Sequence, residues 1–273
     1  MASLDVVATM MQPTYGISGV VYTDRRRDPA ADAHRWLTEG YRVSPEMRQT
    51  SWQGHDMFVV TCQHAQQIRT SPGRDSAPMP ASAPLEGLAM GHFFQHGPEA
   101  VQHASVSLHA LNGFQRRGVS SFNDLNGSWV CVIWDRDRQV AHFVRDSVGS
   151  YRLYAMRLPG RVVFTTDLRL FRAAGFLGAL DEQAVAEFLH YLYIPPPRTI
   201  ARNCHAVLAG HVLTIGRDTI EQERYIGPRF VAGASLPPSS DVRREAERYL
   251  PVFEDALMTA VADCLPPAGK VVL

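Results

Sequence analysis

Residues 125–135 read LNGSWVCVIWD, and residues 128–134 within them form an apolar run rich in β-branched and aromatic side chains. Two similar runs, QVAHFV and RVVFTT, follow at residues 139–144 and 161–166. The turn-forming triplets DRD and LPG lie between the runs. Apolar β-branched runs separated by such turns are typical of strands. The pattern therefore predicts three consecutive antiparallel strands.

The segments on the N-terminal side predict one more strand and two helices. Residues 16–22, GISGVVY, form a short apolar run that indicates a buried first strand. Residues 32–40 have a helical pattern, and residues 71–84 contain four prolines and indicate a mobile loop. A second helix is predicted from a stripe of apolar residues that stops at Gly118, namely Leu108, Leu111 and Phe114.

The segments on the C-terminal side predict a capped helix, a strand and a long helix. Asp181 is placed to cap a helix that runs to Tyr191, and three prolines follow at 195–197. Residues 211–215 read as a strand. A Pro-Pro-Ser-Ser linker then leads to a helical pattern over residues 241–264. Large apolar residues recur on it every four positions, at Tyr249, Phe253, Leu257 and Val261.

The composition is that of a globular protein. The chain has 273 residues with 45% hydrophobic content, enough for a sizeable core. Its 27 basic and 27 acidic residues balance, so no net field favours nucleic acid or a membrane surface. No apolar run approaches the length of a membrane helix, and the N-terminus lacks a secretory pattern. We therefore expect a cytoplasmic protein without nucleic-acid or membrane partners.

The cysteines and histidines give no metal motif. Cys62, Cys131, Cys204 and Cys264 lie far apart without C-x-x-C spacing. His92 and His96 are four residues apart, which could form a metal face only if that segment were helical, and the glycines at 91 and 97 disfavour a helix. We expect reduced thiols and no metal site.

Three stretches in order resemble the glutamine-dependent asparagine synthetase family. The first is LNG at 125–127 with VIWD at 132–135 and then Arg145-Asp146, Gly149 and Leu153-Tyr154. The second runs from Phe188-Leu189 through PRTI at 197–200 to Gly210-His211. The third is the terminal helix with GKVVL at 269–273. Gly16 to Gly19 extends the resemblance weakly toward the N-terminus.

The resemblance implies an α+β fold, a four-layer αββα sandwich of the N-terminal-nucleophile hydrolase type. It divides the chain into an N-terminal extension at 1–14, a glutaminase-like domain at 15–228, and a region at 229–273. That last region would hold a linker, a helix and the first strand of a truncated ATP-pyrophosphatase-like domain. In this family the first domain releases ammonia from glutamine and the second uses ATP to activate a carboxylate.

The nucleophile of that glutaminase is absent from the expected position. The family places a cysteine at the mature N-terminus, where its thiolate attacks and the free α-amine acts as base. The family's Cys-Gly-Ile reads Tyr15-Gly16-Ile17 here. A phenol of pKa about 10 is protonated at neutral pH and too bulky for that role. A misaligned N-terminus is the alternative, but the nearest cysteine, Cys62, has no strand-start context.

Two further elements of the glutaminase are missing. The family's Asn-Gly oxyanion segment aligns with Met90-Gly91, so a thioether replaces the stabilising amide. The aspartate for the glutamine α-amine should lie between Glu99 and Asp124, where the sequence has no acidic residue. We expect no catalytic residue in this domain. Arg145 and Asp146 are interpreted as a turn brace, and Arg198 as a domain-contact residue.

Two functions follow from the resemblance. One is the N-terminal scaffold of an ATP-dependent amide-forming ligase, as in the β-lactam synthetase and lasso-peptide cyclase branches, or in ammonia-dependent asparagine formation. The other is a non-catalytic protein that docks on a separate synthetase chain or holds a peptide. The expected partners are a synthetase domain in cis or in trans, a peptide or small carboxylate substrate, and a second copy in a homodimer. ATP and magnesium are expected only in a downstream synthetase domain, and a fragment is one reading of the stop at Leu273.

Overall fold

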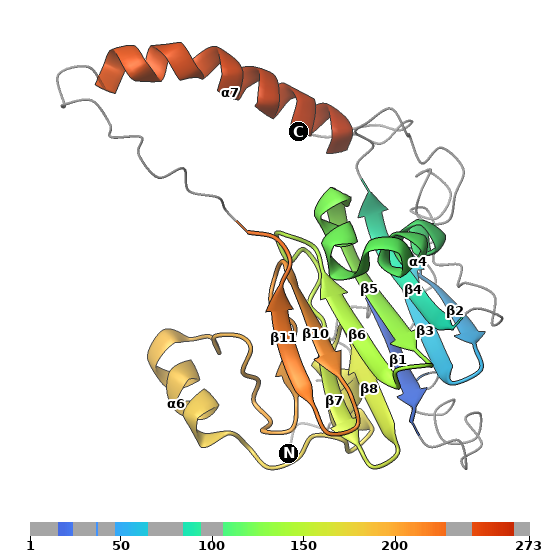
Figure 1. The fold of residues 1–273 in the computed structure, drawn as a ribbon. Coiled ribbons are helices and arrows are strands. Elements are labelled where there is room, and N and C mark those ends of the chain that lie inside the picture. Colours follow the sequence, from blue (N-terminus) through green and yellow to red (C-terminus); the bar gives the residue numbers. More distant parts are fainter. Residues whose placement is uncertain are drawn as a thin grey trace.

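The computed structural model describes residues 16–23, 37, 47–64, 84–93, 106–227 and 242–264. Its strands form two antiparallel sheets of six and five strands, with helices beside them (Figure 1). A cluster of buried side chains from both sheets fills the space between them. The predicted α+β sandwich is therefore confirmed.

Both sheets mix strands that are distant in the sequence. The six-stranded sheet has the order β2-β3-β1-β8-β7-β9 and consists of β1 (Gly16–Tyr22), β2 (Met47–Gln53), β3 (Met57–His64), β7 (Tyr154–Leu158), β8 (Arg161–Thr165) and β9 (His205–Ala206). The five-stranded sheet has the order β11-β10-β6-β5-β4 and consists of β4 (Leu85–Phe93), β5 (Gly127–Asp135), β6 (Val140–Arg145), β10 (His211–Ile215) and β11 (Ile220–Arg224).

Strand β1 is fully buried, as its apolar sequence predicts. It lies between β3 and β8, and all seven of its residues are buried. Ile17 and Val21 face the core between the sheets, whereas Val20 and Tyr22 face the outer side of the six-stranded sheet. This period of two follows from the pleat of a strand.

The prediction of three consecutive strands is wrong for the third. Strands β5 and β6 pair with each other as expected, but β8 belongs to the other sheet, between β1 and β7. After β6 the chain crosses to the six-stranded sheet and forms the β7–β8 hairpin. The sequence pattern indicates a strand but does not encode its neighbour, because pairing depends on distant residues.

Helix α4 (Val106–Arg117) and the 3-10 helix η1 (Gly118–Asp124) pack on the five-stranded sheet. Leu111 and Phe114 are buried there, as predicted, but Leu108 is 36% exposed and lies outside the contact. Ala110 takes its place in the core. Gly118 has a φ of +62°, the left-handed conformation in which glycine ends helices.

Two shorter helices follow β8 in the sequence. Helix α5 (Leu168–Ala173) buries Leu170 and Phe171 against its outer face. Helix α6 (Glu182–Tyr191) begins at Asp181, whose carboxylate accepts hydrogen bonds from the backbone N–H of Gln183 and Ala184 at 3.0 and 3.2 Å. The predicted cap and helix are confirmed, including the end at Tyr191.

The long helix α7 (Val242–Cys264) is also confirmed. Its four predicted stripe residues are exposed by 48 to 63%, namely Tyr249, Phe253, Leu257 and Val261. Residues 71–83 and 265–273 lie outside the described residues, as does the 32–40 segment except for the buried Leu37. The division at 15–228 and 229–273 stays a prediction. None of the described helices is long and apolar enough to cross a membrane.

His142 makes the stability of this sandwich depend on pH. The residue lies on β6, is 8% exposed, and its Nδ1 lies 3.0 Å from Thr214 Oγ1. Its Nε2 has no hydrogen-bond partner among the described residues. Burial lowers the pKa of His142 from 6.5 to about 4; Asp135 acts to raise the pKa and Arg138 to lower it further. The folded protein therefore keeps this imidazole neutral.

We predict that stability is lost as the pH falls from about 6.5 to about 4. The unfolded chain binds a proton on His142 in this range and the folded chain does not, so protonation favours unfolding. The contribution is on the order of 2 kcal/mol, from about 1.4 kcal/mol per unit of pKa difference reduced for relaxation. Urea unfolding of the wild type and of His142→Leu at pH 7.5 and 4.5 measures it. An equal pH dependence in both proteins would contradict the prediction.

Candidate functional site

The N-terminal end of β1 is where the family resemblance places the nucleophile. Tyr15 lies outside the described residues, immediately before Gly16, the first residue of β1. The Ile17 N–H donates to Thr166 Oγ1 at 3.1 Å, and the Thr166 N–H donates to the Ile17 carbonyl at 2.9 Å. Gly16 has a φ of +149°, and a Cβ there would lie 1.7 Å from Thr166 Oγ1. The Thr166 side chain therefore leaves no room for a side chain at Gly16.

Met90 lies at the position that the family resemblance assigns to the oxyanion-stabilising asparagine. It lies on β4, is 0% exposed, and belongs to the core between the sheets together with Leu88 and Ile17. A thioether has no N–H or O–H to donate to an oxyanion. The Met90 side chain therefore makes an apolar core contact and offers no hydrogen-bond donor.

Gly91, the next residue on β4, is required by the close approach of β4 to β5. Its φ is +141°, and a Cβ there would lie 2.2 Å from the carbonyl oxygen of Ser128 and 2.6 Å from the Cα of Trp129. Strand β4 therefore approaches β5 too closely for any side chain at this residue. The neighbouring His92 lies on β4, so the helix that its metal-binding interpretation would have required is absent, and His96 lies outside the described residues.

Cys62 cannot replace the missing nucleophile. It pairs with Gly16 across β3 and β1, which brings a thiol close to the start of β1. Its side chain, however, lies on the outer side of the six-stranded sheet with Val20 and Val60, whereas Met90 lies between the sheets. Burial also raises the pKa of the Cys62 thiol, which disfavours the reactive thiolate.

Arg145 and Asp146 hold the loop in which the chain crosses from β6 to the other sheet. The Arg145 guanidinium donates to the carbonyl oxygens of Val207 and Gly149 at 2.5 and 2.7 Å. Its backbone carbonyl accepts a hydrogen bond from the Tyr225 hydroxyl at 2.6 Å. These contacts join three segments that are distant in the sequence.

The Asp146 carboxylate is fully buried and accepts hydrogen bonds from four backbone N–H groups. They belong to Trp129, Val148, Gly149 and Ser150, at distances of 2.6 to 3.2 Å. The Asp146 carbonyl also accepts from the Gly210 N–H at 2.9 Å. All these partners are structural groups, so the geometry is that of a loop brace.

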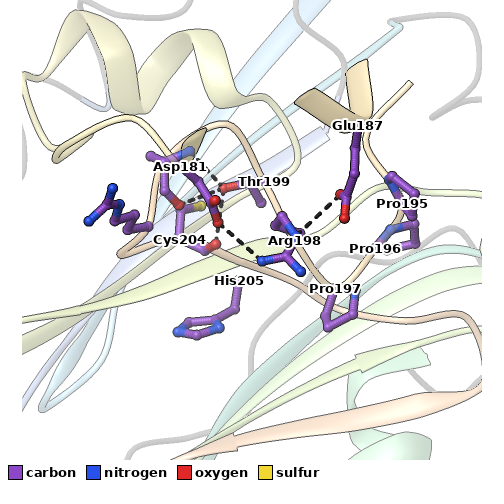
Figure 2. A pocket seen from close by; sticks show the side chains of 11 residues that line it. Asp181, Glu187, Pro195, Pro196, Pro197, Arg198, Thr199, Cys204 and His205 are labelled. Atoms are coloured by element: carbon purple, nitrogen blue, oxygen red, sulfur yellow. Dashed lines mark hydrogen bonds and ion pairs between the residues drawn. The ribbon is translucent and has the colours of Figure 1, made fainter. Parts of the chain in front are cut away.

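Arg198 lies in a pocket between α6 and the proline segment (Figure 2). Its Nε donates to the Glu187 carboxylate at 3.2 Å and its Nη1 to Asp181 at 3.4 Å. The pocket has a volume of about 330 Å³ and is also lined by Pro195, Pro197 and others. Arg198 therefore braces α6 against the segment that follows it.

The other polar side chains of this pocket are not activated for catalysis. Burial raises the pKa of the Cys204 thiol to about 12, despite a hydrogen bond from Thr199 that acts to lower it. Burial and the Arg157 charge both lower the pKa of His205. At neutral pH the pocket thus offers a thiol and a neutral imidazole. Its two arginines are already paired, Arg198 with Asp181 and Glu187 and Arg202 with Glu182.

A buried polar cluster, which the sequence did not indicate, joins the two sheets at the other end of β1. Glu86 of β4 is 0% exposed, pairs with Arg136, and accepts from the backbone N–H of His55 and Asp56 at 3.2 and 3.3 Å. Asp56 in turn accepts from the indole N–H of Trp134 at 3.2 Å and lies 3.4 Å from Arg136 Nε. The sequence sign of this cluster is Glu86 itself, an acidic residue within the apolar run of β4.

His55, Asp56 and Glu86 bring three possible metal-ligand atoms within 4.8 Å of one another. Arg136 already supplies a positive charge to both carboxylates. Because a cation would have to compete with this guanidinium, the arrangement favours a structural ion cluster over a metal site.

The described residues form two packed antiparallel sheets with a crossing loop braced by Arg145 and Asp146. Residues 100–226 match the sequence profile of the glutamine amidotransferase domain family. The solved structure of glutamine phosphoribosylpyrophosphate amidotransferase from Bacillus subtilis superimposes with a TM-score of 0.50 at 10% identity. The superposition covers 77% of this chain and 49% of the amidotransferase chain. This likeness concerns the fold.

Two curated proteins match parts of the sequence. Amidase chyE of Penicillium rubens is 29% identical over 111 residues, 41% of this chain and 16% of its own length. Asparagine synthetase [glutamine-hydrolyzing] 1 of Bacillus subtilis is 22% identical over 138 residues, 50% of this chain and 20% of its own length. The match thus spans a fifth or less of each relative. The resemblance to an asparagine-synthetase-type, class II amidotransferase-like domain is confirmed.

Proposed function

We propose that this domain is the non-hydrolysing N-terminal part of an asparagine-synthetase-like, ATP-dependent amide-forming ligase. The observation that carries the proposal is the full burial of Met90 in the core between the sheets, at the position of the oxyanion donor. Tyr15 at the cysteine position and the absence of an acidic residue between Glu99 and Asp124 support it independently.

The chemistry of glutamine hydrolysis explains why these losses matter together. Attack on the side-chain amide needs a thiolate, a base and a donor for the developing oxyanion. Removal of one oxyanion donor alone costs roughly 100- to 1,000-fold in rate, and loss of the nucleophile removes the covalent route. A domain without either has no path to an acyl-enzyme. Its fold then serves as a scaffold.

In such a ligase the ammonia donor becomes unnecessary. An amine of the substrate itself would attack an acyl adenylate, and a peptide or a small carboxylate would supply the acyl group. Ammonia-dependent asparagine formation is the variant in which free ammonia attacks. ATP and magnesium would bind a synthetase domain in cis or in trans, in the cytoplasm. The free, buried Cys62, Cys131 and Cys204 agree with a reducing compartment.

The exposed apolar side chains of α7 favour a second candidate, a non-catalytic docking protein. Seven large apolar side chains on this one helix are about half exposed or more: Tyr249, Leu250, Val252, Phe253, Leu257, Met258 and Val261. Contiguous apolar surface of this kind marks interaction sites. Both candidates require a partner on α7. They differ in whether the complex forms an amide bond.

The first test is a glutaminase assay, and we predict no turnover. Glutamate release from glutamine should equal that of the heat-treated protein, because no thiolate or oxyanion donor is available. The Bacillus subtilis glutamine-hydrolysing asparagine synthetase serves as the positive control. Met90→Asn should restore nothing by itself, since the nucleophile is still missing. Glutamate release clearly above background in the wild type would disprove the proposal.

A further inference from the structure

Most of the large apolar side chains that the sandwich exposes lie at one place, the end of α6. Outside α7, nine such side chains are exposed among the described residues, and five of them belong to α6 and the turn after it. These five are 48 to 79% exposed, and we call them the α6 patch: Phe188, Leu189, Tyr191, Leu192 and Tyr193. The α6 patch is therefore the main apolar surface on the described part of the sandwich.

The α6 patch keeps its shape without a bound partner. Asp181 caps the helix, and Arg198 pairs with Glu187 on it. The Tyr191 ring lies edge-on to the His190 ring, with 4.5 Å between the two ring centroids. A surface whose side chains are already ordered loses little entropy on binding.

Helix α7 carries a second apolar surface in the same chain. Its stripe residues are 48 to 63% exposed, namely Tyr249, Phe253, Leu257 and Val261. Because they recur every four positions, the stripe is roughly 18 Å long. Figure 1 shows α7 apart from the two sheets, so both the stripe and the α6 patch face solvent in this structure. Removing apolar area from water is favourable, so contact between the two surfaces is favoured.

The chain that joins the two surfaces is long enough for them to meet. Residues 228–241 lie between the sandwich and α7, and a segment of this length can span about 50 Å. It follows β11, which is tied to the α6 side of the fold. Gln222 of β11 accepts from the Leu208 N–H at 3.0 Å, and the nearby Ala206 N–H donates to the carbonyl of Pro197, in the segment that leaves α6, at 2.9 Å.

Two surfaces joined in this way meet at an effective concentration on the order of millimolar. Their contact loses no translational freedom, so it needs less buried area than a contact between separate chains. We propose that α7 packs on the α6 patch of its own chain when no partner is bound, so that the two apolar surfaces cover each other. This closed form does not depend on the ligase assignment. A partner that binds α7 must then displace it from α6, which lowers the apparent affinity by the open fraction.

The distance between spin labels on α6 and α7 of the full chain, measured by double electron–electron resonance, tests the proposal. Ala186→Cys and Thr259→Cys supply the label sites, both at exposed positions. Cys264→Ser removes one native thiol, and the remaining native thiols are buried. Packed helices have axes 8–10 Å apart, so we expect a label distance of roughly 30 Å or less.

Charged substitutions on either surface should open the closed form. Leu189→Glu on α6 and Leu257→Glu on α7 should each lower the ratio of closed to open molecules at least about tenfold, because each places a charge in the apolar contact. Val148→Glu is the matched control, at a side chain of the crossing loop that is 81% exposed and lies outside both surfaces. It should leave the label distance unchanged. Circular dichroism confirms that each variant is folded.

Dilution with an excess of unlabelled protein separates a contact within one chain from a contact between chains. The short distance should persist on dilution, because both labels lie on the same molecule. A broad distribution without a short distance in the wild type would overturn the proposal. A short distance that dilution removes, or one that Val148→Glu abolishes as fully as Leu189→Glu and Leu257→Glu do, would overturn it as well.

Discussion

Glu86→Ala is expected to lower the free energy of unfolding by about 3–5 kcal/mol, the usual cost of removing one partner of a buried ion pair. Glu86 is fully buried, pairs with Arg136, and accepts from the N–H groups of His55 and Asp56. Its removal leaves the Arg136 charge with the Asp56 carboxylate alone and leaves two backbone donors without their acceptor. The carboxylate also links β4 of one sheet to the β2–β3 turn of the other.

Urea unfolding at pH 7.5 measures this loss. Asp124→Ala is the matched control, because Asp124 pairs with Arg117 at 2.6 Å on the surface, where the two side chains are 59% and 55% exposed. It should cost less than about 1 kcal/mol. Glu86→Gln, which keeps the shape and one acceptor, should fall between the two. If Glu86→Ala and Asp124→Ala cost the same, the cluster has no special role in joining the sheets.

Asp146→Ala is expected to cost about 3–5 kcal/mol as well, because its carboxylate accepts from four backbone N–H groups in a fully buried position. Each orphaned buried donor carries a desolvation penalty of roughly 1–3 kcal/mol, reduced where water can enter. The loop from Asp146 to Ser150 should lose its order first, since three of the four donors lie in it.

Asp181→Ala is the control of matched chemistry. The Asp181 carboxylate also accepts from two backbone N–H groups, but it caps a helix at the surface and is 17% exposed. Its loss should destabilise the protein much less than the loss of Asp146, because water can replace a surface helix cap. Native-state hydrogen exchange should show lost protection at Gly149 and Ser150 only in Asp146→Ala. Intact protection there would mean that Arg145 alone suffices to hold the loop.

The sequence allowed the family resemblance and most of the regular elements near it to be predicted. Strand β1, strands β5, β6 and β10, and helices α4, α6 and α7 each have a local pattern with its own period or cap. The Asp181 cap could be predicted because a capping residue acts on N–H groups two and three positions away. The missing cysteine could be identified in the same way, since a motif is a local comparison.

The contacts made over long sequence separation could not be predicted. Local patterns did not reveal that β8 pairs with β1, about 145 residues away, or that Glu86 meets Arg136, 50 positions further on. The apolar character of α6 gave no sign of whether its side chains are buried, because an apolar residue has the same sequence signature in a core and at an interface. In the structure, five large side chains at the end of α6 and in the turn after it are exposed by 48 to 79%.

The sequence by itself thus predicted the fold family and the capped and striped helices, and it places Tyr15 and Met90 at the glutaminase motifs, which stays a prediction. Only the tertiary structure decided the sheet to which β8 belongs, the burial of Met90 between the sheets, and the ion cluster at Glu86. The physical reason is the sequence separation over which each kind of interaction acts. Caps, turns and periodicity act between residues a few positions apart, whereas sheet pairing and burial depend on which distant segments the whole chain brings into contact.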